Sequence, residues 1–253
     1  MVDGSESTTA IGPDQKSRFL LVVDSDPNSL YSTSMLLQRF SYKTVSAATA
    51  REALTIAAVK VPALVVTALG LKDMSGLDLA QQFRQRSGTS GVPFLALRKP
   101  DDLLGEQECL DQGVACCLTR PVSAEDLYRA VQTAVEKTPR KHIRLRTLLP
   151  VQACKNPDAC LDNACATDLS ERGMFVRTEK PASAKTQLSC ALHLYGQVIE
   201  VDASVLYSYR KNGGTFPEPG MGVEFIRIAP KDQELIRRFI RNEVTRGIAP
   251  QHV

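Results

Sequence analysis

The sequence lacks any long hydrophobic run. No uninterrupted apolar stretch approaches the roughly 18 residues that a membrane-spanning helix needs. Residues 1–16 are polar and acidic, without the basic and apolar segments of a secretory signal peptide. We therefore expect a disordered leader over 1–16, a short tail over 248–253, a cytoplasmic location and no membrane partner.

The net charge is low, and the cysteines show no metal-binding or disulfide-framework spacing. With 31 Lys and Arg against 28 Asp and Glu, the formal net charge of +3 does not by itself indicate a nucleic-acid polymer as partner. Seven cysteines, an odd number without a CxxC pair, favour free thiols in a reducing compartment. Cys154, Cys160 and Cys165 would need a fourth ligand, such as His193, to hold a metal, and unpaired thiols are the simpler interpretation.

Residues 17–137 show alternating short apolar runs and helical patterns. The apolar runs, typical of buried strands, lie at 19–23, 64–66, 93–97 and 114–118, with a shorter candidate at 43–47. The helical patterns cover 27–40, 49–59, 75–86, 101–112 and 123–137. Ser123 and Asp126 resemble a capping box at the start of the last one. Five strands alternating with five helices predict an α/β domain, a doubly wound five-stranded parallel sheet.

From residue 148 the pattern changes to the period-two alternation of half-buried strands. Turn residues at 195–197 and 211–220 separate these strands. The pattern predicts a small antiparallel β-barrel. An amphipathic helix at 229–247, stopped by Gly247, should close the end of the barrel. We assign 138–247 to this second domain, including the basic segment that precedes the strands.

Four stretches characterise the first domain: "LLVVDSDPNSL", "PALVVTALGLKDMSGLDLAQQFR", "VPFLALRK" and "GVACCLTRPVSAEDL". In their order and spacing they resemble a response-regulator receiver domain. The resemblance implies a phosphate-accepting aspartate at the position of Ala68, and two magnesium-binding acids after the first strand. There this chain has Asp24, then Ser25 in place of the second acid, then Asp26.

Three further positions depart from the receiver pattern. The family's switch hydroxyl falls on Arg98, its aromatic switch partner on Cys117 and its lysine on Arg120. Arginine keeps the charge of lysine but not its compact ammonium. With Ala68 as a degenerate phosphoacceptor position, we expect no phosphorylation and no magnesium, and a receiver that acts as an interaction or presentation module.

Two residues near the degenerate position leave alternatives. Thr67 is a substitute acceptor in principle, but it lies one residue early and should face away from the pocket. Arg98 either fills the vacated pocket and pairs with Asp24 or Asp26, or binds an unknown anion.

Two short motifs mark the second domain. "PRKHIRLR" supplies an R-x-x-x-R motif with Arg140 and Arg144. "DLSERG" supplies a D-x-S-x-x-G motif with Asp168, Ser170 and Gly173, and a "GMGVEF" strand and a helix follow. In this order the motifs resemble a PilZ domain, a family of receptors for the bacterial second messenger cyclic di-GMP. The resemblance implies that these five residues form the ligand site.

The ligand's chemistry fits these residue types. Its two phosphodiesters are anionic, and guanidinium groups bond phosphate, fork onto guanine O6 and N7, or stack on a purine. Asp168 can accept from guanine N1–H or N2–H, and Ser170 can add a hydrogen bond. Gly173 would supply a backbone conformation or a close approach that a Cβ blocks.

Four neighbouring residues have less defined roles. Lys141 and Arg146 would add positive charge to the site. Tyr207 and Tyr209 would either stack on a base or simply belong to a barrel face. Taken separately, the basic segment is typical of a solvated linker and "DLSERG" of a polar turn.

We therefore expect a non-enzymatic signalling receptor with cyclic di-GMP and an unidentified protein as partners and no cofactor. A homodimer is left open. The alternative is a ligand-independent interaction adaptor, related to motility or pilus assembly. A regulator controlled by phosphorylation is disfavoured by Ala68.

The joint between the domains should be short. Thr138 and Pro139 leave about two residues between the last receiver helix and Arg140. Four basic groups within residues 140–146 repel each other and lack acids in that segment. We expect a joint that is mobile until the ligand orders it, which would re-aim the receiver.

Overall fold

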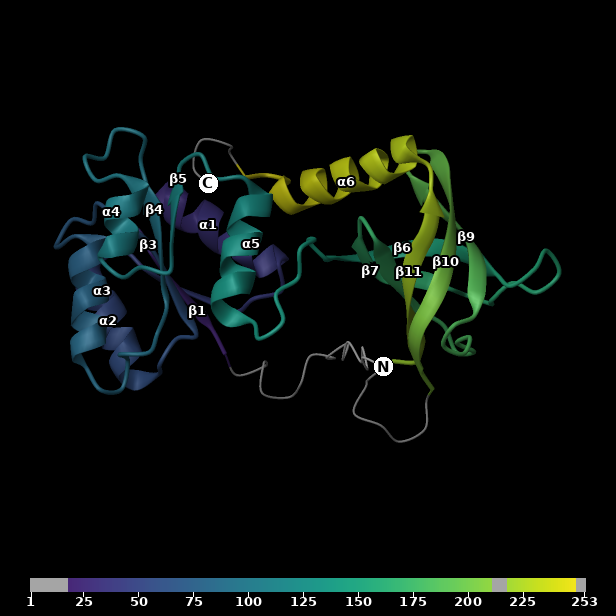
Figure 1. The fold of residues 1–253 in the computed structure, drawn as a ribbon, viewed down its shortest axis with the longest axis horizontal. Coiled ribbons are helices and arrows are strands. Elements are labelled where there is room, and N and C mark those ends of the chain that lie inside the picture. The colour runs from purple at the N-terminus through teal and green to yellow at the C-terminus, as the bar shows by residue number, and fades with distance from the viewer. Residues whose placement is uncertain (1–17, 211–217, 249–253) are drawn as a thin grey trace, which may run out of the picture.

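The computed structural model describes residues 18–210 and 218–248, which form an α/β domain beside a β-barrel (Figure 1). The expected leader over 1–16, the tail beyond residue 248 and most of the turn at 211–220 lie outside the described residues. Among the helices within the described ranges, none is long and apolar enough to cross a membrane.

Both predicted architectures are confirmed. The first domain comprises β1 (Leu20–Val23), α1 (Pro27–Arg39), β2 (Thr44–Ala47), α2 (Ala50–Val59), β3 (Leu64–Ala68), α3 (Gly76–Gln85), β4 (Phe94–Arg98), α4 (Glu106–Asp111), β5 (Cys116–Thr119) and α5 (Ala124–Val135). The second comprises β6 (Leu145–Cys154), β7 (Cys165–Ser170), β8 (Gly173–Arg177), β9 (Gln187–Leu194), β10 (Gln197–Tyr209), β11 (Gly220–Ile228) and α6 (Pro230–Thr245). The parallel sheet has the order β2-β1-β3-β4-β5, and the antiparallel strands close a barrel in the order β10-β11-β8-β7-β6-β9.

The receiver sheet is buried on both faces. Every residue of β1 and β3 is buried, which is why these strands read as continuous apolar runs. Leu36 of α1 and Leu127 of α5 belong to one core cluster, and Ala53 of α2 and Leu79 of α3 belong to another. This arrangement brings the carboxyl ends of the strands together at one edge, where α/β sheets place their sites.

Polar residues set the starts of the helices. The backbone N–H of Asp126 donates to Ser123 Oγ at 3.0 Å, which confirms the predicted cap of α5. Helix α4 is shorter than the predicted 101–112. The carboxylate of Asp102 accepts from the Lys99 N–H at 2.7 Å and forms a turn, so the helix begins only at Glu106.

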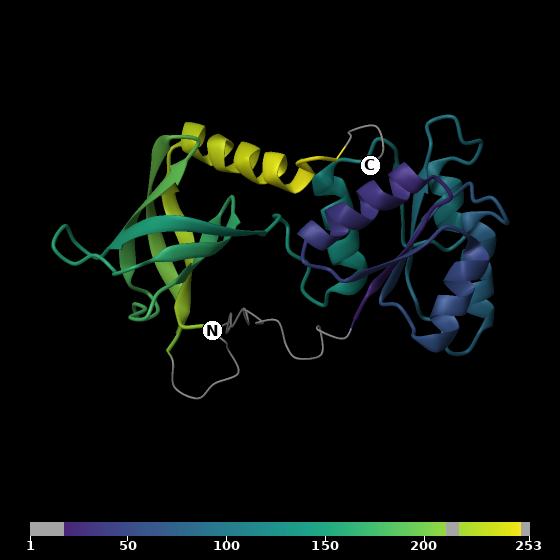
Figure 2. The ribbon, with the colours of Figure 1, turned by 180° about the vertical axis from the view of Figure 1, so that it is seen from behind.

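Helix α6 does more than close the barrel. It contacts β6, β7 and β9, but its second half also lies against α1 and α5 of the receiver (Figures 1 and 2). Arg39 of α1 donates to the Val244 carbonyl at 2.6 Å, and Arg241 Nε donates to Glu125 of α5 at 3.0 Å. The expectation that this helix only closes the end of the barrel was therefore incomplete, because the helix also joins the two domains.

The joint between the domains is held by hydrogen bonds. The Arg140 N–H donates to Gln132 Oε1 at 2.9 Å, and Gln132 Nε2 donates to the Tyr42 hydroxyl at 2.6 Å. His142 Nδ1 lies 2.7 Å from Glu171 Oε1. The expectation of a loose joint rested on four basic groups without acids in residues 140–146. The structure adds one acid from outside that segment, Glu171 of the β7–β8 turn, beside His142. The mobility of the ligand-free joint stays a prediction.

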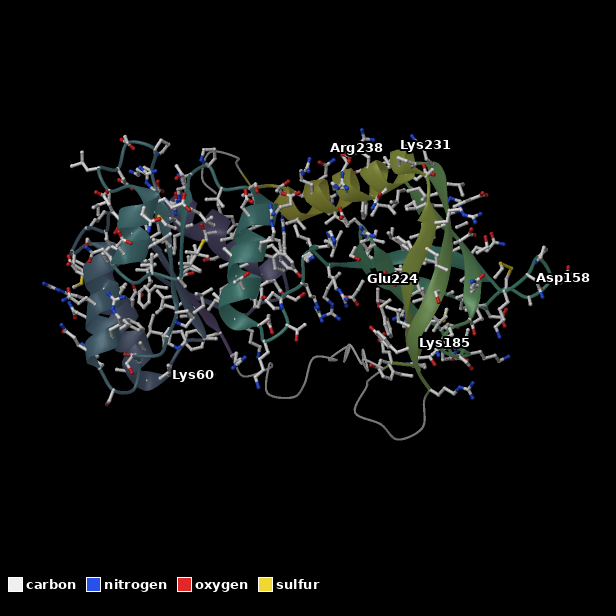
Figure 3. The ribbon with its side chains drawn as sticks, in the orientation of Figure 1. Lys60, Asp158, Lys185, Glu224, Lys231 and Arg238 are labelled. Atoms are coloured by element: carbon white, nitrogen blue, oxygen red, sulfur yellow. A yellow bond between two sulfur atoms is a disulfide. The ribbon has the colours of Figure 1, made fainter. Side chains whose placement is uncertain are left out.

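The expectation of unpaired thiols is wrong for two cysteines. Cys154 and Cys160 form a disulfide, because the chain folds back after β6 and brings the two residues together as a β-bridge. Figure 3 shows this bond near Asp158, at the end of the barrel remote from the receiver. The described free cysteines are Cys109, Cys116, Cys117, Cys165 and Cys190. The described residues contain no group of three or more His, Cys, Asp or Glu able to hold a metal.

Candidate functional site

A buried ion pair occupies the carboxyl edge of the receiver sheet. Asp24 follows β1, Arg120 follows β5, and Ala68 ends β3. Arg120 Nη2 lies 2.6 Å from Asp24 Oδ2, and the two side chains are only 9% and 5% exposed. Both charges are therefore desolvated and depend on each other. The sequence pattern showed the lysine-to-arginine change but not this pairing.

The residues at this edge do not fit a magnesium ion. The second oxygen of Asp24 accepts from the Asp26 N–H at 2.9 Å, so both of its oxygens are engaged. Ser25 Oγ donates to the Ala48 carbonyl and accepts from the Lys72 N–H. A methyl group at Ala68 supplies no oxygen. Magnesium requires several oxygen ligands in octahedral geometry, and this edge offers a neutralised carboxylate instead.

Arg98 does not pair with Asp24 or Asp26. Its Nη1 donates to Thr119 Oγ1 at 3.2 Å and its Nη2 donates to the Asp102 carbonyl at 3.0 Å. The turn after β4 brings that carbonyl within reach of the guanidinium. Because Arg120 already neutralises Asp24, the pairing predicted for Arg98 is wrong.

Thr67 is inaccessible. Its side chain is completely buried within β3, and its hydroxyl donates to the Ala68 carbonyl at 3.0 Å. A phosphate donor cannot reach a fully buried hydroxyl without opening the sheet.

Two motif residues of the second domain, Asp168 and Ser170, lie on the outer face of the barrel. Leu145 of β6 is paired with Leu169 of β7, and both are buried inside. The adjacent pair, Arg146 and Asp168, therefore projects outward. Ser170 lies two residues beyond Asp168 on the same strand and faces the same side. The barrel thus places Asp168 and Ser170 on one surface, beside the start of β6.

The basic segment surrounds Asp168 electrostatically. Burial raises the pKa of the Asp168 carboxyl, while the positive charges of Arg146, Arg144 and Arg140 oppose that shift. All three arginines therefore lie close enough to act on Asp168. Lys141, by contrast, is exposed. The two halves of the sequence motif, Arg140 with Arg144 and Asp168 with Ser170, are brought together.

Gly173 is required for a close approach. A Cβ at this position would lie 2.3 Å from the Val223 carbonyl oxygen of β11, a distance that no side chain tolerates. Its φ is not in the left-handed region. Of the two roles considered for Gly173, the structure supports close packing of β8 on β11. Ser170 Oγ donates to the Gly173 carbonyl at 3.0 Å and fixes the turn between them.

The arginines lie between the barrel and the receiver. Burial raises the pKa of the Tyr128 hydroxyl on α5, while the charges of Arg140 and Arg144, and a hydrogen bond from Arg140, oppose the shift. The same two arginines act on Asp168 of the barrel. The site is therefore at the junction of the domains.

Glu171 is a residue of this site that the sequence pattern did not reveal. It lies inside the D-x-S-x-x-G motif and contacts His142 of the basic segment and Arg237 of α6, the latter at 2.8 Å. Arg237 also donates to Glu234 at 2.6 Å. The two partners of Glu171 come from two segments that are distant from it in the sequence, so spacing along the chain gave no signal.

Aromatic rings lie farther along the same outer face. The ring centroids of Phe175 and Tyr207 are 6.5 Å apart, and those of Tyr207 and Tyr209 are 5.3 Å apart. All three side chains are half-buried. Glu224 of β11, paired with Gly173, lies on the side of the barrel nearer the receiver (Figure 3).

The fold and the site define a two-domain signalling protein, a doubly wound sheet domain joined to a barrel with a basic segment over an outward carboxylate. Residues 20–132 match the response regulator receiver domain, and residues 138–242 match the PilZ domain. A receiver domain is thus followed in this chain by a PilZ domain. Both are non-enzymatic signalling domains, and the PilZ domain supports a cyclic di-GMP receptor.

Known proteins resemble about half of the chain. The transcriptional regulatory protein KdpE of Mycobacterium tuberculosis (strain H37Rv) is 30% identical over 118 residues, 47% of this chain and 51% of that protein. Protein PilH of Pseudomonas aeruginosa is 21% identical over 116 residues, 46% of this chain and 96% of that protein. The matched region thus spans about half the length of KdpE. A putative response regulator from Chloroflexus aurantiacus, a solved structure, is 23% identical with a TM-score of 0.45, covering 47% of this chain and 98% of that one.

Proposed function

We propose that this chain binds cyclic di-GMP where the barrel meets the receiver, and that its receiver works without phosphorylation. One observation carries the proposal. Arg140 and Arg144 act on Asp168, which projects from the barrel's outer face beside Ser170. Cationic donors and a hydrogen-bond acceptor thus lie together on one accessible surface.

Each group has a task in this proposal. The guanidinium groups of Arg140 and Arg144 bond the phosphodiester oxygens or fork onto guanine. The Asp168 carboxylate accepts from guanine N1–H and N2–H. Burial raises the pKa of Asp168 in the free protein, which means that keeping the carboxylate ionised there costs free energy. A ligand that donates hydrogen bonds to the carboxylate offsets this cost. Gly173 and Ser170 hold the turn that presents the carboxylate.

The receiver serves as an interaction or presentation module. The Asp24–Arg120 ion pair and the alanine at position 68 support this role, because the edge has neither an acceptor nor a free acid pair. Helix α6 and the Gln132–Arg140 hydrogen bond tie the receiver to the arginine segment. Ligand binding would therefore be communicated to the receiver through these contacts.

Calorimetric titration with cyclic di-GMP tests the proposal. A charge-assisted hydrogen bond contributes roughly 1.5–3 kcal/mol, so Arg140→Ala or Arg144→Ala should each weaken binding by about one to two decades. Lys141→Ala is the matched control and should change affinity less. Absence of binding by the wild type would overturn the receptor assignment in favour of the ligand-independent adaptor. Full affinity in Arg144→Ala would refute the site.

A further inference from the structure

The receiver carries a groove beside β2, the outermost strand on one side of its sheet. The groove has a volume of about 830 Å³, and its lining comes from both layers of helices. Gln38 belongs to α1, whereas Ile56 and Val59 belong to α2. Phe19, which precedes β1, also lines the groove, so it lies at the end of the sheet opposite the Asp24–Arg120 ion pair. The groove therefore follows the outer edge of β2.

Strand β2 offers a backbone edge at this groove. Among the described strands, only β1 pairs with β2. The carbonyls of Lys43 and Ala47 accept from backbone N–H groups of the β1 segment, at 2.8 and 3.1 Å. Successive residues of a strand in a parallel sheet direct their backbone groups to alternate sides, so those of Thr44 and Ser46 point away from β1. An extended segment can pair with these two residues as an added strand.

The two sides of this edge differ in polarity. Gln38 Nε2 of α1 donates to Thr44 Oγ1 at 2.7 Å, so the Thr44 side chain faces α1. Side chains alternate along a strand, so Val45 projects to the other side, toward α2. There Val45 is 37% exposed and Val59 is 87% exposed. An added strand would therefore place every second side chain against open apolar groups.

The charged residues of the groove are of one sign. Lys43 and Lys60 line it, and none of the described lining residues is acidic. Lys60 follows α2 (Figure 3), and its Nζ lies 5.6 Å from the centre of the Phe19 ring. Basic groups beside an apolar groove favour a segment that carries acids next to its apolar side chains. The same lysines disfavour a second copy of this chain, because pairing two β2 edges about a two-fold axis brings like charges together.

We propose that this groove is the docking site for an extended, acidic segment of a partner protein. The segment adds to β2 as a strand, covers Val45 and Val59 with apolar side chains and places a carboxylate beside Lys60. The proposal deepens the proposed function, because it gives the interaction role of the receiver a defined surface and a partner of defined chemistry. Only the coupling to cyclic di-GMP, argued next, rests on the proposed function.

Two hydrogen bonds connect the groove to the arginine segment. Tyr42 lines the groove, and its hydroxyl accepts from Gln132 Nε2 at 2.6 Å. Gln132 Oε1 in turn accepts from the Arg140 N–H at 2.9 Å. Gln132 is buried, so these two bonds hold it in one orientation. Partner docking and cyclic di-GMP binding should therefore change each other's affinity by the same factor.

Selection from a library of random displayed peptides, with the full chain as target, tests the docking site. Enriched peptides should alternate apolar and polar side chains and carry Asp or Glu. Synthetic copies should bind Val59→Glu and Lys60→Glu about tenfold or more weakly than the wild type. Both side chains are exposed, so neither change disturbs the core. Leu103→Glu is the matched control, because Leu103 is a fully exposed receiver residue outside the groove, and it should bind like the wild type.

Other results would overturn this docking site. Peptides that bind Val59→Glu and Lys60→Glu as tightly as the wild type would place the surface elsewhere, and a selection without enrichment would exclude an acidic strand as occupant. Enrichment only after removal of residues 1–16 would make that segment the occupant. A dimer in sedimentation analysis that Val59→Glu abolishes would make a second copy the occupant.

Peptide affinity with and without saturating cyclic di-GMP tests the coupling. The two affinities should differ by about fivefold or more in the wild type. They should be equal in Tyr42→Phe, which keeps the ring in the groove but loses the hydroxyl that binds Gln132. Equal affinities in a wild type that binds cyclic di-GMP would overturn the coupling alone. A wild type that binds the peptide but not cyclic di-GMP would overturn the proposed function and support the docking site.

Discussion

Removing Arg120 should destabilise the receiver strongly. In Arg120→Met, the Asp24 carboxylate keeps the Asp26 N–H but loses the guanidinium 2.6 Å away, in a place where Asp24 is only 5% exposed. Breaking a buried ion pair on one side costs about 3–5 kcal/mol. Because one hydrogen bond to Asp24 remains, we expect the lower end, about 3 kcal/mol. That loss corresponds to roughly a hundredfold shift in the unfolding equilibrium.

Urea denaturation followed by far-ultraviolet circular dichroism measures this loss. The double variant Asp24→Asn with Arg120→Met leaves no buried charge and should recover much of the stability. Arg129→Met is the matched control. Arg129 pairs with Asp126 at 2.8 Å, but the two side chains are 61% and 53% exposed, so its removal should cost at most about 1 kcal/mol.

The result that would refute this reasoning is specific. If Arg120→Met changes stability no more than Arg129→Met does, the ion pair contributes nothing. A double variant less stable than Arg120→Met alone would contradict the uncompensated charge as the cause. Either result would show that the Asp24–Arg120 ion pair does not stabilise the carboxyl edge of the receiver sheet.

Three further predictions follow from the same structure. Acetyl phosphate or beryllofluoride with magnesium should leave the chain unmodified because Ala68 offers no oxygen, and mass spectrometry showing stoichiometric phosphorylation of a receiver residue would contradict this. Burial raises the pKa of Asp168, so the ionised carboxylate lowers the stability of the folded chain at pH 7. Asp168→Asn should therefore unfold at a higher urea concentration than the wild type. This gain should disappear below about pH 4, where the wild-type carboxyl is protonated in both the folded and the unfolded state. The same variant should bind cyclic di-GMP more weakly, and a variant both less stable and equally tight would refute the assigned role. Glu171→Gln should lower the free energy of unfolding by about 1–2 kcal/mol, because it weakens the bonds to Arg237 and His142. Amide hydrogen exchange in α6 should then become faster. Unchanged exchange would show that Glu171 does not hold the helix.

The features that sequence predicted well are those encoded by near neighbours. Apolar runs predicted four strands of the parallel sheet, since burial on both faces, as in β1 and β3, leaves a continuous hydrophobic signal. The fifth strand, β2, is partly exposed and gave only the shorter candidate at 43–47. The Ser123 cap was equally local. Period-two alternation gave the barrel, because one side of each strand faces its core.

The features that sequence missed depend on distant segments meeting. Arg98 was the candidate partner of Asp24, but Arg120 pairs with Asp24 instead, and the turn after β4 supplies the carbonyl that binds Arg98. The contact between Glu171 and Arg237 joins residues 66 positions apart, and no periodicity reports such a pair. Phe175 becomes a neighbour of Tyr207 only through the strand order of the barrel, which spacing along the chain does not reveal.

The position of α6 also bears on how the molecule is made. Receiver helices α1 and α5 precede α6 in the chain, so both leave the ribosome before the helix that lies against them. The receiver can complete its sheet from its own residues while the barrel is still being synthesised. Docking of α6, through Arg39 and Glu125, is then a late step that joins two domains already formed. A chain shortened before Pro230 would lose this docking contact together with four α6 side chains that are buried in the core, Leu235, Ile236, Ile240 and Val244.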